Sequence, residues 1–288
     1  MSIATISPDF PENTDPSTVH GVGEVAFSLR DGRSGLSHLY QHDPVRILFP
    51  VQSATEPPLA TVVTTSGGLV SGDIIEIEAT VNEGASALVV AQAAEKIYRS
   101  NGADSRIDVR LTALQAAWLE WLPQEAIIFD EARLRRRTLI NAAPGATVLA
   151  GEMLVFGRIA SGETFSRGLL RDAWEVRCEN NLIWADASHL EGDVARQLDN
   201  PAGFGAARAM ATAVLVCDEA ASHLEIAREI AAQASGVRAS ATVVNGVLLI
   251  RWLSEDPQRL RQAFDQGWCK LRQTVGGYAP QLPRLWHI

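Results

Sequence analysis

Cysteine is scarce in this chain of 288 residues, and the few cysteines present are isolated from one another. Cys178, Cys217 and Cys269 lie far apart, and no CxxC motif occurs. An odd number of separated cysteines argues against a disulfide framework and favours a reducing compartment. The sequence also lacks ligands at the spacing of a closed structural zinc site. These absences disfavour secreted disulfide scaffolds and zinc-stabilised modules.

Targeting signals and long apolar runs are missing as well. Residues 1–20 are polar, contain Pro8, Pro11 and Pro16, and have neither the basic start nor the apolar centre of a signal peptide. We expect residues 1–20 to form a flexible arm that becomes ordered on a partner. No apolar stretch has the length of a membrane span. The sequence therefore predicts a cytoplasmic protein without membrane contact.

The signatures of several common functional classes are absent. There is no GxSxG nucleophile elbow. The glycine-rich stretch 67–73 lacks both the Lys-Ser/Thr of a phosphate loop and the GxGxxG spacing, and a tight turn is its simplest interpretation. A net charge of −9 without a basic stripe argues against nucleic-acid binding. One tight basic cluster, Arg133, Arg135, Arg136 and Arg137, is typical of a solvated strand or loop face.

Alternation of apolar and polar residues dominates the first two thirds of the chain. Residues 75–81 and 106–112 alternate as half-buried strands do, and residues 86–92 have the composition of a more buried strand. Turn signals at 82–84 and 144–145 separate such runs. The pattern predicts a mainly β protein with an extended, layered or helical (solenoid-like) β arrangement, although no fixed-period repeat is present.

The last third changes character. Residues 210–217 read as a buried strand, and residues 219–235 have the apolar spacing of a helix. Asn245-Gly246 predicts a hairpin turn, and a second helix is expected to begin at Asp256-Pro257 and to end at Gly276-Gly277. We therefore predict two α-helices in the C-terminal third. Because no linker composition occurs, residues 21–288 are expected to form a single domain.

Several carboxylates lie in or beside apolar runs, where an unpartnered charge is costly to bury. Each is accounted for equally well by an ordinary salt bridge with a nearby arginine. As a set, they fit a hydrated polar path through a β core. These residues are Glu95, Glu120, Glu125, Asp130, Glu152, Asp172 and Asp186.

A series of unusual motifs follows in a fixed order along the chain. They are residues 65–69 with Gly72-Asp73, residues 91–100, residues 119–125 with 128–130, residues 151–158, residues 171–174 and residues 283–286. In this order and spacing the chain resembles the urease accessory protein UreD family, called UreH in some bacteria, from about Gly21 to the C-terminus. Small departures occur at Ser71, Ala91 and Gly151, where the family often has glycine, threonine and an aromatic residue.

The resemblance implies an accessory protein and not an enzyme. Members form a complex with UreF and the GTPase UreG on urease apoprotein, and a homodimer within that complex is compatible with the family. The resemblance implies that GTP hydrolysis by UreG then drives the insertion of nickel into the urease active site and the carbamylation of its lysine. A water-filled tunnel is proposed to carry nickel in transit, with no permanently bound cofactor.

Motif by motif, the resemblance assigns the metal path to a set of oxygen ligands, which hold nickel more weakly than thiolates and imidazoles would. They are Asp73, Glu95, Ser100, Glu125, Glu152, Asp172 and Asp186. Residues 134–137 and the C-terminal helices are candidate partner surfaces. Two other interpretations stay open: a stand-alone hydrolase or lyase with Glu125 and Asp130 as acid and base, and a simple nickel store.

Overall fold

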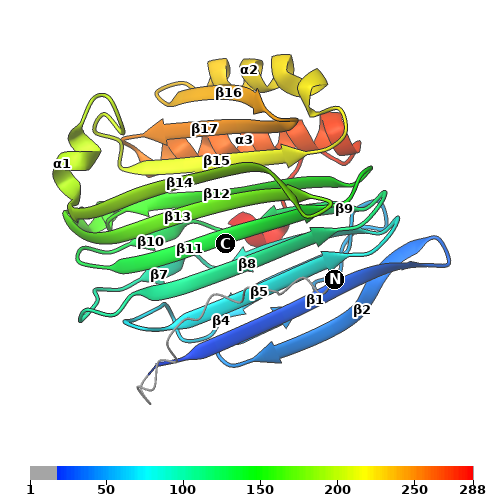
Figure 1. Cartoon of the computed structure of the whole chain (residues 1–288), viewed down its shortest axis with the longest axis horizontal. Coiled ribbons are helices and arrows are strands. Elements are labelled where there is room, and N and C mark those ends of the chain that lie inside the picture. Colours follow the sequence, from blue (N-terminus) through cyan, green and yellow to red (C-terminus); the bar gives the residue numbers. More distant parts are fainter. Residues whose placement is uncertain (1–17, 288) are drawn as a thin grey trace, which may run out of the picture.

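Two β-sheets make up most of the computed structural model, which describes residues 18–287 (Figure 1). Sheet A has seven strands in the order β14-β13-β11-β8-β5-β1-β2. Its strands are β1 (His20–Arg30), β2 (Arg33–His42), β5 (Ile74–Val81), β8 (Ser105–Ala113), β11 (Arg133–Ala142), β13 (Arg167–Cys178) and β14 (Asn181–Asp193).

Sheet B has ten strands, eight of them in the order β16-β17-β15-β12-β9-β6-β4-β3, with β10 pairing with β12 and β7. Its strands are β3 (Val45–Leu48), β4 (Leu59–Thr64), β6 (Ser86–Gln92), β7 (Glu95–Ile97), β9 (Trp118–Leu122), β10 (Ala126–Ile128), β12 (Thr147–Phe156), β15 (Ala209–Val216), β16 (Arg238–Val244) and β17 (Val247–Ser254).

The chain passes back and forth between the two sheets, which gives the fold its solenoid-like character. β5, β8, β11 and β13 pair in parallel in sheet A, while β6, β9 and β12, which alternate with them along the chain, pair in parallel in sheet B. Short turns at residues 82–85, 114–117 and 143–146 connect each strand of sheet A to the next strand of sheet B. The predicted mainly β, layered architecture is confirmed.

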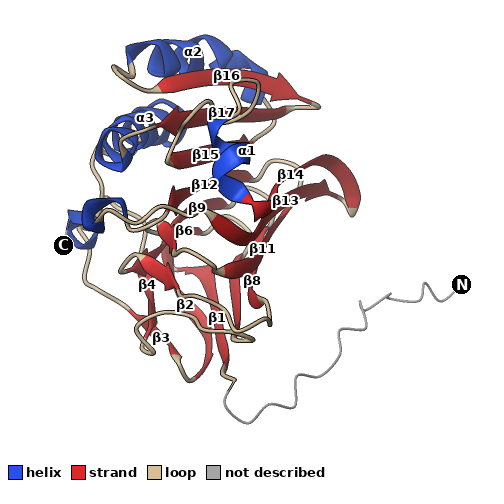
Figure 2. Ribbon diagram, turned by 90° about the vertical axis from the view of Figure 1, so that its left-hand side faces the viewer, coloured by secondary structure: helices blue, strands red, loops and turns tan. Residues whose placement is uncertain are grey.

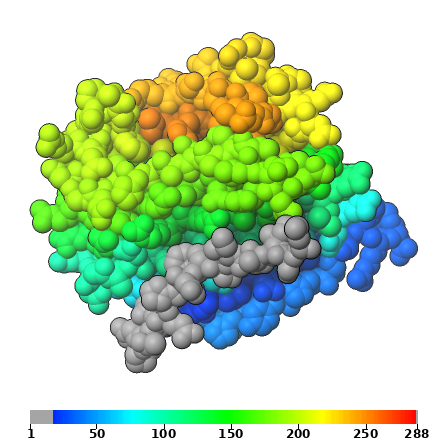
Figure 3. Space-filling view, viewed as in Figure 1, coloured from blue at the N-terminus to red at the C-terminus, as the bar shows by residue number. Residues whose placement is uncertain are grey.

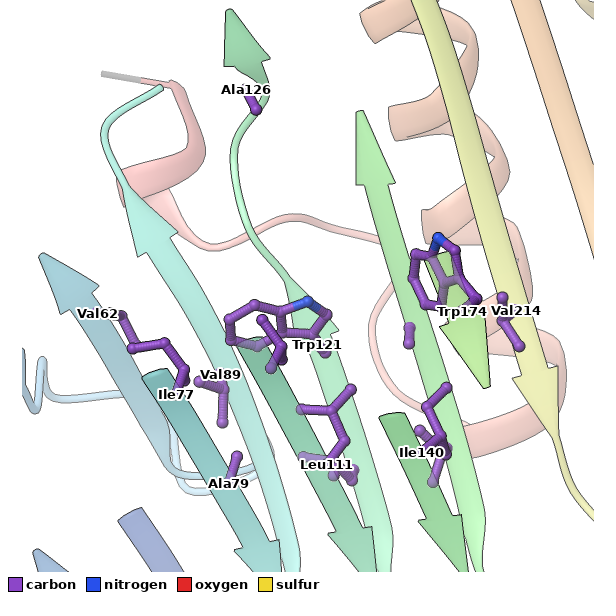
Figure 4. Close-up of a cluster of buried hydrophobic side chains, with 14 of the residues drawn as sticks. Val62, Ile77, Ala79, Val89, Leu111, Trp121, Ala126, Ile140, Trp174 and Val214 are labelled. Atoms are coloured by element: carbon purple, nitrogen blue, oxygen red, sulfur yellow. The ribbon is translucent and has the colours of Figure 1, made fainter. Parts of the chain in front are cut away.

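The strands are amphipathic, and their inner faces enclose the main core. Trp121 from sheet B and Trp174 from sheet A lie in this core, together with Ile77, Leu111 and Ile140 (Figure 4). A second core lies between the other face of sheet B and the C-terminal helices. In the side view these helices lie on the face of sheet B that points away from sheet A (Figure 2). Sheet B is therefore buried on both faces, which explains why all residues of β9 and β15 and nearly all residues of β12 are buried.

The helices of the described residues are α1 (Val194–Asp199), α2 (Leu224–Gln233) and α3 (Pro257–Gly276). The two predicted helices are confirmed, with Asp256 capping α3 and Gly277 following it at φ 69°. α2 begins later than residue 219, because residues 220–223 form a 3₁₀ turn. The sequence analysis did not predict α1, whose six residues are too few to show a helical period.

The predicted flexible arm at residues 1–20 falls mostly on residues 1–17, which lie outside the described residues; His20 already belongs to β1. A single domain over residues 21–288 stays a prediction, and the shared core between the sheets is compatible with it. Between residues 18 and 287, no helix has both the length and the apolar character needed to cross a membrane.

Candidate functional site

One group of polar side chains interrupts the apolar inner faces of the sheets around β11 and β12. Alternation along β11 directs Arg136 and Thr138 inward, along with Leu134 and Ile140 of the core. The inner faces of β13, β12 and β9 contribute further members. We call this group the inter-sheet polar cluster; it consists of Trp121, Arg136, Thr138, Glu152 and Asp172.

The cluster connects the two sheets through charged groups that are almost completely buried. Arg136 on sheet A donates through Nε to Asp172 Oδ1 at 2.7 Å. Glu152 on sheet B accepts at Oε1 from Trp121 Nε1 at 3.1 Å and from Thr138 Oγ1 at 2.9 Å. Arg136 Nη2 lies 2.9 Å from Glu152 Oε2, but the two atoms are too poorly aligned for a hydrogen bond. Each of these atoms therefore retains unused hydrogen-bonding capacity.

Electrostatics within the cluster oppose burial. Burial raises the pKa of the Glu152 carboxyl, the adjacent Arg136 guanidinium lowers it, and the Asp172 carboxylate raises it further. Burial also acts to lower the pKa of Arg136, but Asp172 and Glu152 outweigh this effect and the pKa is raised. With both carboxyls ionised, the cluster carries one negative charge in excess. It is therefore a place that favours a further cation or proton.

Polar residues continue from the cluster toward the outside along the same layer. In sheet B, Thr212 of β15 lies opposite Glu152, and Arg251 of β17 lies opposite Thr212. Arg251 forms an ion pair with Asp186 of β14, so the two sheets are linked a second time. The side chains of this pair are 41% and 32% exposed, in contrast to the buried cluster.

Unpaired buried atoms are concentrated in this layer. Besides Arg136 and Glu152, Trp174 Nε1 and Arg251 Nε have no hydrogen-bond partner in the described part of the chain. Trp174 lies opposite Asp186 in the pairing of β13 with β14. We call the cluster together with Trp174, Asp186, Thr212 and Arg251 the inter-sheet polar band. It runs from the centre of the core to a half-exposed ion pair.

Glu95 faces the same layer at another position. β7 places it two residues before the core residue Ile97, and it pairs in register with Ala126, which pairs in turn with Leu154 of β12. Thr64 Oγ1 donates to its carboxylate at 2.8 Å. Burial raises the pKa of Glu95 to about 7, with the Thr64 hydrogen bond acting in the opposite direction. Glu95 is therefore a poorly compensated carboxyl on the inner face, two strands from β12.

Three other residues assigned to the metal path make different contacts. Asp73 accepts hydrogen bonds from the backbone N–H groups of Val19 and Val70 and thereby fixes the loop before β5. Ser100 Oγ lies 2.9 Å from Ser71 Oγ. Glu125 forms an ion pair of 2.6 Å with Arg261 of α3. The seven residues thus do not form one group: Glu152 and Asp172 meet, Asp186 extends their layer, and Glu95 faces it.

The cationic members of the band are not evident from local sequence. The predicted solvated face for Arg133, Arg135, Arg136 and Arg137 is wrong for Arg136, whose side chain is 6% exposed. The alternation of residues 133–142 indicates the buried position of Arg136, because Arg136 lies on the same face of the strand as the core residues Leu134 and Ile140. The pairing of Asp186 with Arg251 joins residues 65 positions apart, so local sequence could not reveal it. No group of three or more His, Cys, Asp or Glu placed to hold a metal ion occurs in residues 18–287.

Comparison with known proteins identifies the relatives of this chain. Residues 19–287 match the family model described as UreD urease accessory protein. The urease accessory protein UreD of Magnetococcus marinus is 46% identical over 283 residues, which cover 96% of this chain and 98% of the relative. UreD of Brucella suis is 39% identical, with 94% and 95% covered, and UreD 1 of Brucella anthropi is 35% identical, with 93% and 94% covered. The matches span both sheets and the C-terminal helices, and the chain therefore belongs to the UreD family of urease accessory proteins.

Proposed function

We propose that this protein is a non-catalytic scaffold that delivers nickel during urease maturation. In this proposal it assembles in the cytoplasm with UreF-like and UreG-like proteins on urease apoprotein. Two copies of this chain can form a homodimer within that complex. Nickel is cargo in transit, and the protein needs no resident cofactor. Membership of the UreD family supports the accessory role. The inter-sheet polar band is the observation that supports a transit path.

The chemistry of the band suits a cation that must move on. Its acceptors are carboxylate and hydroxyl oxygens, which bind nickel more weakly than thiolate or imidazole ligands do. The excess negative charge in the polar cluster offsets part of the cost of bringing a cation between the sheets. Oε2 of Glu152 is ion-paired with Arg136 but accepts no hydrogen bond, so it keeps acceptor capacity for a cation. Weak binding with spare acceptors permits both entry and release.

The seven predicted residues take different parts in this proposal. Glu152, Asp172 and Asp186 line the path, and Glu95 lines its approach along the inner face of β7. Asp73 and Ser100 support the loops at the ends of β5 and β7, and Glu125 holds α3 in place through Arg261. We thus propose direct contact with nickel for the first four and a supporting role for the last three.

The geometry weighs against a hydrolase or lyase that uses Glu125 and Asp130. Glu125 is ion-paired with Arg261, while Asp130 accepts hydrogen bonds from the backbone and side chain of Ser166. The two carboxyls are therefore held by different elements. The hydrogen bonds from Ser166 also lower the pKa of Asp130 against the effect of burial, which is unfavourable for a general acid.

Nickel content of urease tests the proposal. We would express the urease operon in cells lacking this protein and complement them with wild type, with Glu152→Gln/Asp172→Asn, or with the control Glu83→Gln at an exposed position in the turn after β5. We expect the double variant to reduce nickel per urease active site at least about tenfold, while co-purification of the accessory proteins persists. The control should retain wild-type nickel content. A second double variant, Asp73→Ala/Glu152→Ala, is tested in the same way. Unchanged urease nickel content in both double variants would contradict the transit path. Loss of co-purification would show a defect in the scaffold instead.

A further inference from the structure

The outer face of sheet A carries an unusual concentration of arginine. This face is turned toward the viewer in Figure 3. On β11, alternation directs Arg133, Arg135 and Arg137 outward, while Arg136 points into the core. The neighbouring strands repeat the pattern, with Arg106 and Arg110 at outward positions of β8.

β13 adds three more arginines, and the outward positions of the three strands together hold eight arginines and two carboxylates. The added residues are Arg167, Arg171 and Arg177. The chain as a whole has a net charge of −9. This surface, which we call the arginine strip, therefore has the opposite sign to the rest of the protein.

Strand register places like charges side by side within the strip. Arg106 pairs with Arg135 across β8 and β11, and Arg135 pairs with Arg171 across β11 and β13. Like charges directly opposite each other destabilise a sheet. The row of three arginines thus works against folding, and folding stability does not account for it. An arrangement that costs stability at an exposed surface points to binding.

The carboxylates near the strip orient the arginines and neutralise part of their charge. Arg106 lies 3.6 Å from Asp108, and Arg110 lies 3.0 Å from Glu78. Asp104 accepts from the Nε atoms of both Arg133 and Arg135 at 2.6 Å. Glu175 likewise lies 2.9 Å from Arg137 and 3.1 Å from Arg177. Each carboxylate is therefore shared by two guanidinium groups, although Arg133 also lies 3.7 Å from Glu191. The set around Glu175 is left with one positive charge in excess. Such fixed guanidinium forks are suited to carboxylates from another molecule.

Two further arginines of the strip have no partner of their own. In the part of the chain that the structure describes, the side chains of Arg167 and Arg171 form no ion pair and no hydrogen bond, and both are exposed. A hollow of about 310 Å³ at the edge of the strip is lined by Arg106, Arg110 and Arg137 but also by four carboxylates, Glu24, Glu76, Glu78 and Asp108. The unpaired positive charge of the strip therefore lies away from this hollow, at Arg167 and Arg171 on β13.

We propose that the arginine strip is a docking site for an acidic protein surface, with aspartate or glutamate side chains as the groups it binds. Glu76 and Glu78 of β5 border the strip on one side and Glu191 of β14 on the other. Three strands are only about 10 Å across, so a nucleic-acid backbone crossing the strip meets these carboxylates. A carboxylate patch of a protein fits the narrow strip, and this inference does not depend on nickel transit.

Fluorescence anisotropy with a labelled poly-glutamate peptide at low ionic strength tests the docking site on the full chain. We expect Arg135→Ser/Arg171→Ser to weaken binding at least about tenfold. The control Arg196→Ser/Arg228→Ser removes the same charge from exposed positions on α1 and α2 and should change the affinity less than twofold. If the double variant does not fold, Arg171→Ser alone breaks no contact and should still weaken binding about threefold.

Three results would overturn the docking site. If the control variant weakens peptide binding as much as Arg135→Ser/Arg171→Ser does, the peptide is held by non-specific electrostatic attraction and not by a defined site. Binding of a single-stranded oligonucleotide of the same charge as tightly as the peptide would assign the strip to nucleic acid. Self-association of the wild type in sedimentation velocity that disappears in Arg135→Ser/Arg171→Ser would identify a second copy of the chain as the occupant.

Discussion

Arg136 has a different environment and role from the two arginines next to it on β11. Arg135 and Arg137 point to solvent, but Arg136 lies between the sheets beside Asp172 and Glu152. Removing one partner of a buried ionic group leaves the remaining charge uncompensated, which is far more costly than the loss of an exposed ion pair. The inter-sheet polar cluster is therefore sensitive to substitution at its single guanidinium.

We predict that Arg136→Met lowers the free energy of unfolding by about 3–5 kcal/mol, because two buried carboxyls lose their counter-charge. Urea denaturation followed by circular dichroism measures this change. Arg135→Met on the same strand is the matched control and should cost about 0–1 kcal/mol, since its ion pair with Asp104 is exposed. Equal losses in the two variants would contradict the buried position of Arg136.

Glu95 gives the protein a pH dependence with a defined sign. Its pKa is raised from 4.5 to about 7 by burial, so the folded state holds the proton more tightly than the unfolded state. Its contribution to stability is present below pH 4.5 and is lost as the pH rises toward 7. We predict that the wild type loses about 1–3 kcal/mol relative to Glu95→Gln between pH 4.5 and 7. Denaturation of both proteins across this range checks it, and parallel pH profiles would refute it.

Helix α3 is attached to sheet B by a second buried network. Glu120 of β9 accepts from Trp268 Nε1 at 3.2 Å and from Arg272 Nε at 2.9 Å. Arg272 also donates to Glu56 at 2.7 Å and to the backbone oxygen of Ala279 at 2.6 Å. One side chain thus joins the helix to the sheet, to the loop before β4 and to the C-terminal segment.

Close packing beneath α3 leaves no room for a side chain at Gly151 of β12. A Cβ atom there would lie 2.7 Å from Cζ of Phe264 and 2.9 Å from Cζ3 of Trp268. The aromatic rings of Phe264 and Trp268 from α3 fill this place. The C-terminal motif joins the same packing, because Trp286 Nε1 donates to Asp265 of α3 at 2.8 Å.

We predict that Arg272→Met loosens the C-terminal segment, residues 277–287, because the Arg272 guanidinium joins the backbone of Ala279 in this segment to Glu120 and Glu56. The free energy of unfolding should fall by about 3–5 kcal/mol. Hydrogen exchange should show faster exchange in this segment and in α3. Lys270→Met, an exposed substitution on the same helix, serves as the control and should leave the exchange of the segment unchanged. Equal exchange rates in the two variants would argue against this attachment.

At the scale of the whole molecule, sheet B belongs to both cores and connects them. One face of each of its central strands packs against sheet A, while the other packs against α2 and α3. A perturbation on either side therefore reaches the same strands. The sharing favours one cooperative unit over residues 21–288, as expected from the lack of a linker.

We predict a single thermal transition in calorimetry, with the van 't Hoff and calorimetric enthalpies equal. Arg136→Met and Arg272→Met, which act on opposite faces of sheet B, should each lower the midpoint of that one transition. Splitting of the transition in either variant would show that the C-terminal helices and the solenoid-like region unfold separately. The wild type measured at several scan rates controls for irreversible unfolding.

The sequence by itself determined the class of fold, most of the strands, both longer helices and the family. These features depend on local signals: the period of alternation, the cap at Asp256, the Asn245-Gly246 turn and the order of motifs. It also identified Glu152 and Asp172 as unusual, because a carboxylate in an apolar strand is costly wherever that strand packs. Only the tertiary structure decided which charges meet. Arg136 with Asp172, Arg251 with Asp186, and the row of Arg106, Arg135 and Arg171 all arise from pairing between strands far apart in sequence, and strand register is set by packing of the whole sheet.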